Sequence, residues 1–108
     1  PTLVLFAPDG GEITRLPCEL DGESFAAAFD TALAVHAAGS GAAAALTAAS
    51  SGARKLGADE WSLLSHYSWD TDEGRLLGGR DLAATLLALA RACNGVDADA
   101  AARLALHG

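Results

Sequence analysis

Residues 2–17 read TLVLFAPDGGEITRLP, and this stretch decides the fold. Residues 2–7 are apolar at almost every position, which is typical of a strand covered on both faces. Residues 8–11 combine a proline, whose ring fixes φ, with two glycines that tolerate positive φ, and this combination favours a tight turn. We therefore predict a β-hairpin in which residues 2–7 pair antiparallel with residues 12–17. Pro17 has no N–H donor, so it places that end of the returning strand at a sheet edge.

Helical patterns occupy much of the remaining chain, in keeping with its high alanine content. Asp21 can cap a helix that ends at Gly39 and carries a stripe of residues spaced three and four apart: Phe25, Ala28, Phe29, Ala32, Leu33 and His36. Asp81 can cap a second helix with its own apolar stripe: Leu82, Leu86, Leu89, Ala90 and Cys93. Residues 42–49 contain one large side chain and predict a weaker helix. Asp97 can cap a short last helix.

Residues 61–69 read WSLLSHYSW and hold half of the aromatic side chains, including both tryptophans and the tyrosine. A period of two places on one face Trp61, Leu63, Tyr67 and Trp69. We predict a strand here rather than the alternative, a helix that starts at Asp59. Residues 70–74 then form a loop that returns through residues 75–77 and completes a second hairpin. The predicted fold of residues 1–108 is a single α+β domain: a small antiparallel sheet from two β-hairpins, covered by the two main helices, with one or two short helices.

Charge and length exclude several classes of function. Acidic residues number 14 and basic residues 7, which gives a net charge of −7, so we expect no binding to nucleic acid or to an anionic membrane. No apolar run reaches the roughly 18 residues of a membrane-spanning helix, and the first residues lack the basic charge of a secretory signal. We predict a soluble, cytoplasmic protein. Cys18 and Cys93 are too few for a disulfide framework, and we expect them to be small buried side chains.

The first residue of the chain suggests one enzymatic alternative. A proline at an N-terminus carries a secondary amine that can act as a base or nucleophile when it lies near a cation. Residues 1–6, PTLVLF, resemble the start of the first strand in the tautomerase superfamily. The resemblance implies a cofactor-independent isomerase or decarboxylase in which Pro1 is catalytic. That family continues towards a long helix, whereas here residues 8–11 predict a hairpin turn.

Other combinations of reactive side chains do not fit a known chemistry. Ser62, His66, Ser68 and Asp70 supply the residue types for acyl transfer, but alternate residues of a strand lie about 7 Å apart and no nucleophile elbow is present. A solvated strand face explains the same pattern. The acidic residues before Gly74 are too few for a calcium loop, and the histidines and cysteines lack metal-ligand spacing. We predict no metal site and no cofactor.

The aromatic and acidic residues of the second predicted hairpin are the candidate binding residues: Trp61, His66, Tyr67, Trp69, Asp70, Asp72 and Glu73. Tryptophan and tyrosine often dominate partner binding, so we expect Trp69 to be partly exposed beside an acidic rim. The leading hypothesis is a small, acidic, non-catalytic protein-binding module of the inhibitor, immunity or adaptor type, for which a basic protein is a natural partner. The alternatives are that these rings form the core, or that the chain is the subunit of a homo-oligomer.

Overall fold

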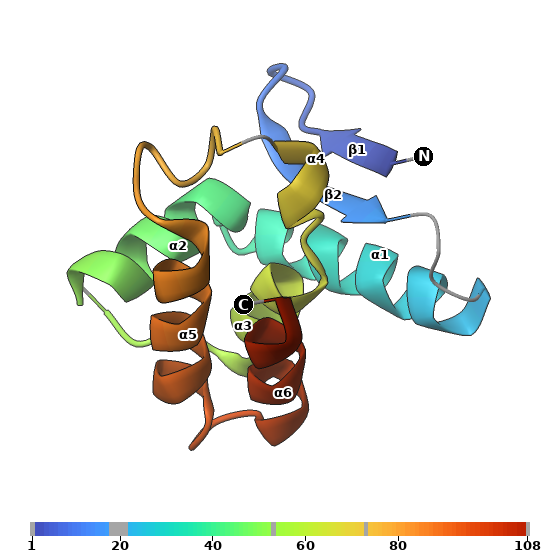
Figure 1. The fold of residues 1–108 in the computed structure, drawn as a ribbon. Coiled ribbons are helices and arrows are strands. Elements are labelled where there is room, and N and C mark those ends of the chain that lie inside the picture. The colour runs from blue at the N-terminus through green and yellow to red at the C-terminus, as the bar shows by residue number, and fades with distance from the viewer. Residues whose placement is uncertain (1, 18–21, 53, 73, 108) are drawn as a thin grey trace.

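The computed structural model describes residues 2–17, 22–52, 54–72 and 74–107, and it has the α+β class predicted from the sequence (Figure 1). Its elements in chain order are β1 (Thr2–Phe6), β2 (Glu12–Pro17), α1 (Gly22–Ala37), α2 (Ala42–Ser51), α3 (Ala58–His66), α4 (Trp69–Asp72), α5 (Leu82–Cys93) and α6 (Ala98–His107). The β-hairpin lies at one end of the molecule, and α5 and α6 lie side by side at the other end (Figure 1).

The first hairpin is confirmed. β1 and β2 pair antiparallel from Thr2 opposite Pro17 to Phe6 opposite Glu12, with a β-bulge between Leu5 and Phe6. Gly10 has a φ of 90° in the turn, a conformation that glycine adopts without a steric penalty. The turn is closed by the backbone, since Ala7 N donates to Gly11 O over 2.7 Å.

The second predicted hairpin is wrong. Residues 58–66 form α3, residues 69–72 form the short helix α4, and residues 74–79 form a series of turns. The buried face of α3 has helical spacing, with Trp61, Leu64 and Ser65 buried at i, i+3 and i+4. The period of two across the aromatic residues is therefore a coincidence of spacing. The alternative reading, a helix that begins near Asp59, is the correct one.

The predicted helices are present, and their ends have identifiable caps. The Asp81 carboxylate accepts from Ala84 N over 2.8 Å at the start of α5, and the Asp97 carboxylate accepts from Ala100 N over 3.1 Å at the start of α6. After α1, Gly39 takes a φ of 84°, which ends the helix as predicted. The predicted cap Asp21 and Cys18 lie outside the described residues.

The core is built around α3, which packs against α1, α2, α6 and β2. α1 covers β2 as predicted, whereas α5 packs against α6 and α2 rather than on the sheet. Among the described residues, the largest fully buried side chains include Tyr67, Leu16, Leu46, Leu64 and Leu104. No single described helix has both the length and the apolar character of a membrane span; α1 and α2 reach these values only when taken together, and they are bent by 72°.

Candidate functional site

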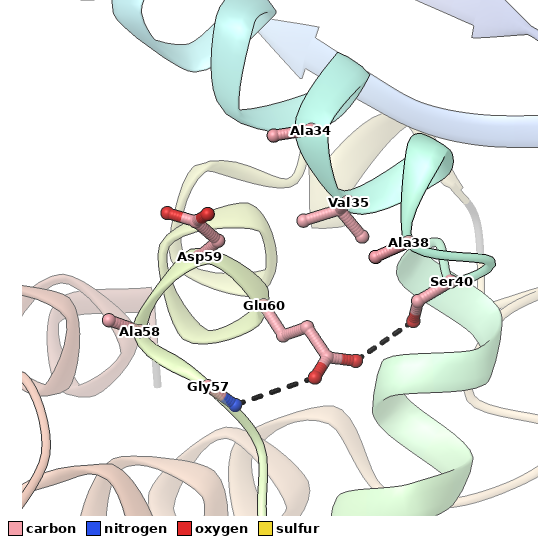
Figure 2. Close-up of a pocket in the computed structure, with 8 residues that line it drawn as sticks. All are labelled: Ala34, Val35, Ala38, Ser40, Gly57, Ala58, Asp59 and Glu60. Atoms are coloured by element: carbon pink, nitrogen blue, oxygen red, sulfur yellow. Dashed lines mark hydrogen bonds between the residues drawn. The ribbon is translucent and has the colours of Figure 1, made fainter.

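The candidate site is a hollow between the end of α1 and the beginning of α3, which we call the α1–α3 hollow (Figure 2). Its volume is about 300 Å³. Small apolar side chains line the α1 side: Ala34, Val35 and Ala38. The opposite wall is the first turn of α3 with the residue before it: Gly57, Ala58, Asp59 and Glu60. Methyl groups thus form an apolar floor beside two carboxylates.

Glu60 holds the two walls of this hollow in place. Its carboxylate accepts two hydrogen bonds of 2.7 Å from Arg54 and one of 2.8 Å from Ser40 Oγ. It also accepts from Gly57 N over 3.4 Å, which satisfies a free N–H at the start of α3 (Figure 2). The hydrogen bonds from Arg54, together with those from Ser40 and Gly57, outweigh partial burial and lower the Glu60 pKa to about 2. Glu60 therefore stays ionised, its charge is compensated by Arg54, and its role is structural.

Asp59 differs from Glu60, because its side chain is exposed and forms no ion pair with a described residue. In Figure 2 its carboxylate lies across the hollow from Ala34. Asp30 stands four residues before Ala34, so the two residues share one face of α1, and Asp30 lies one helical turn before the lining of the hollow. Asp30 is also exposed. Asp59 therefore gives the rim of the hollow a negative charge that no ion pair with a described residue compensates.

The predicted aromatic binding residues lie in the core instead of on a surface. The exposed fractions of Trp61, Tyr67 and Trp69 are 3%, 1% and 4%, so the expectation of a partly exposed Trp69 is wrong. Trp69 Nε1 donates to Leu64 O over 3.2 Å, and its ring meets the Tyr67 ring edge-on with 4.9 Å between centroids. The alanine-rich helices leave space around α3 that large rings fill. The alternative that these rings form the core is the one observed.

Asp72, expected on an acidic rim, is the buried centre of a polar network with an exposed fraction of 2%. Asp72 Oδ1 accepts from the Tyr67 hydroxyl over 2.6 Å, and Oδ2 accepts from Leu76 N over 2.7 Å. The same hydroxyl lies 3.0 Å from Glu12 Oε2, and Glu12 forms ion pairs with Arg15 and Arg75. The network therefore ties α4 and the turns after it to the β-hairpin.

Burial and hydrogen bonds in this network keep Tyr67 protonated and favour the ionised form of Glu12. Burial, followed by the two neighbouring carboxylates, raises the Tyr67 pKa well above its ordinary value, so Tyr67 stays a hydrogen-bond donor. Burial opposes the charge of Glu12, but hydrogen bonds from Arg15, Tyr67 and Arg75 outweigh it and lower the Glu12 pKa. These properties suit a structural cluster that holds the hairpin in place.

Several other candidate residues lie in elements other than the predicted ones, or lie outside the residues that the structure describes. His66 Nδ1 lies 3.0 Å from the carbonyl oxygen of Ser62, so the two residues sit one turn apart on α3 instead of on a strand face. Pro1 and Glu73 lie outside the described residues, so the enzymatic alternative that depends on Pro1 stays a prediction. Asp70 belongs to α4. Within the described ranges, no three histidine, cysteine or acidic side chains are grouped as metal ligands.

The α1–α3 hollow was not predicted from the sequence, although part of its signal is present there. Glu60 three residues after Gly57 is the spacing at which a glutamate reaches back to the start of a helix. Alanines four apart at positions 34 and 38 mark a helix face with room beside it. What the pattern could not supply is that α1 and α3 pack together. No protein-family model, curated protein or solved structure matches this chain.

Proposed function

We propose that this protein is an acidic, non-catalytic binding module that takes a lysine or arginine side chain of a basic protein partner in the α1–α3 hollow. The supporting observation is the Asp59 carboxylate, which is exposed, lacks an ion pair among the described residues and stands beside an apolar floor. Lysine and arginine have the matching composition, with a hydrocarbon stem and a cationic end.

The two parts of such a side chain have separate places in the hollow. The stem lies over Ala34 and Ala38, and the cation reaches Asp59, with Asp30 one turn earlier on α1. Glu60 contributes little charge because Arg54 already neutralises it. The net charge of −7 speeds the encounter with a basic partner and makes association dependent on salt. An inhibitor, an immunity protein and an adaptor would all use such a surface.

We place the module in the cytoplasm. The free, buried thiol of Cys93 supports this compartment, since a reducing environment preserves thiols.

An NMR titration with hexalysine tests this proposal. We expect amide shifts to concentrate at Ala34, Ala38 and residues 57–59, with hexaglutamate giving none. Asp59→Asn should weaken hexalysine binding by about fivefold, the effect of losing one charge-assisted contact of about 1 kcal/mol. The matched control is Asp99→Asn, because Asp99 is exposed in the first turn of α6 and does not line the hollow. Equal weakening by the two variants would mean general attraction to an acidic surface and would refute the proposal.

The homo-oligomer is a second candidate, and it is supported by the outer edge of β1. Ser68 N donates to Arg15 O over 2.8 Å, so the backbone groups of Arg15 point away from β1. In an antiparallel ladder the residue opposite, Val4, then also directs its N–H and C=O away from β2. β1 has no charged side chain, so two copies can pair antiparallel across Val4 without like-charge repulsion.

The variant Val4→Glu separates this second candidate from the first. Inside one hairpin the new carboxylate faces Arg15, which favours folding, but in a symmetric pair it faces a second carboxylate. Light scattering after gel filtration should show a dimer for the native chain and for Val4→Thr, and a monomer for Val4→Glu. A native chain that stays monomeric at all concentrations would refute self-assembly and leave the hexalysine result unaffected.

A further inference from the structure

A second hollow lies on the other side of Arg54, and we call it the Trp61 hollow. Its volume is about 260 Å³, which suits a small molecule. Apolar side chains from α2, α3, α5 and the segments between helices line it: Ala49, Leu56, Trp61, Ala92 and Val96. Arg54 and Lys55 complete the lining. The hollow is therefore apolar with a cationic side.

An unsatisfied donor distinguishes this hollow from an ordinary surface depression. Trp61 is 3% exposed, and its indole N–H is buried without an acceptor among the described residues. The other tryptophan is satisfied, because Trp69 Nε1 donates to Leu64 O. A buried N–H without an acceptor costs free energy, and an acceptor atom that entered from the hollow would recover it.

The cations add a preference for charge. Lys55 is exposed and forms no ion pair with a described residue, whereas Arg54 is committed to Glu60. Only 7 of the residues in this chain are lysine or arginine against 14 acidic ones, so two adjacent cations beside an apolar hollow are a local reversal of the overall charge. An acceptor that also carries negative charge would satisfy both the indole and Lys55.

We propose that the Trp61 hollow binds a small apolar carboxylate. The hydrocarbon part lies against Leu56, Ala92 and Val96. One carboxylate oxygen accepts from Trp61 Nε1, and the Lys55 ammonium pairs with the carboxylate. This inference concerns a different hollow from the proposed protein-binding site and does not depend on it.

The test uses the full chain, labelled with ¹⁵N, and follows the indole N–H resonances of its two tryptophans. Hexanoate should move the Trp61 resonance to saturation and leave that of Trp69 unchanged. Hexanol, which has the same hydrocarbon part without the charge, should bind at least about tenfold more weakly, since one charged hydrogen bond is worth about that factor. Hexylammonium should not bind.

Two variants complete the test. Lys55→Met removes the cation at an exposed position and should weaken hexanoate binding about fivefold while leaving hexanol binding unchanged. Arg91→Met is the matched control, because Arg91 is exposed on α5 and does not line the hollow. The proposal is overturned if the Trp61 resonance does not respond to hexanoate, if hexanol binds as well as hexanoate, or if Lys55→Met binds hexanoate like the native chain.

Discussion

Replacing Asp72 by alanine should destabilise the fold more than any helix cap does. The Asp72 carboxylate is buried and accepts hydrogen bonds from the Tyr67 hydroxyl and from Leu76 N. Asp72→Ala removes both acceptors at once. The Tyr67 hydroxyl can still reach Glu12, but Leu76 N loses its acceptor in a partly buried position.

The magnitude follows from the number and burial of these bonds. A hydrogen bond to a charged group contributes about 1.5–3 kcal/mol, and the second bond adds about 1 kcal/mol. The ion pair with Arg75 adds little, because Arg75 is 60% exposed. We therefore expect Asp72→Ala to lower the free energy of unfolding by about 3 kcal/mol. Asp81→Ala removes a single exposed cap bond and should cost about 1 kcal/mol.

Urea unfolding followed by far-ultraviolet circular dichroism compares the two variants without relying on the fluorescence of Trp69, which shares α4 with Asp72. The native chain and both variants should unfold with similar slopes, so that the midpoints report stability directly. Equal losses, or a larger loss for Asp81→Ala, would show that the Tyr67–Asp72 hydrogen bond does not stabilise the fold.

The remaining predictions concern pH and packing. The Glu60 pKa falls from 4.5 to about 2 on folding, so its stabilisation is complete above pH 4.5 and is lost as pH falls towards 2; acid titration of Glu60→Gln should lack this loss. Tyr67 is the one tyrosine and its pKa is raised on folding, so its contribution is present below pH 10 and is lost at higher pH. Tyrosinate absorbance should therefore rise only as the chain unfolds in alkali, and a rise before unfolding would contradict the buried network. Leu46→Ala empties a fully buried position on α2 and should cost about 3 kcal/mol in thermal or urea unfolding; a loss below about 1 kcal/mol would mean that α2 is loosely packed.

Features with a local cause were predicted from the sequence. The turn of the first hairpin depends on residues 8–11 themselves, and the start of α5 depends on Asp81 and a backbone N–H three residues later. For the same reason the end of α1 at Gly39 was predicted correctly. Each of these signals involves neighbours in the chain, so no knowledge of packing was needed.

Features that depend on distant residues were not predicted. Tyr67 and Glu12 are 55 positions apart, and nothing near Asp72 in the sequence shows that a buried hydroxyl will face it. The wrong strand prediction for residues 61–69 has a different origin. Aromatic residues favour strands, but here they fill the core around a helix. Both hollows exist because helices pack at particular distances, and a local sequence pattern does not reveal those distances.

The Arg54–Glu60 ion pair separates the two hollows, because Arg54 lines the Trp61 hollow and Glu60 lines the α1–α3 hollow. The carboxylate proposed for the Trp61 hollow pairs with Lys55, so Arg54 stays on Glu60 and either hollow can be filled without changing the charge of the other.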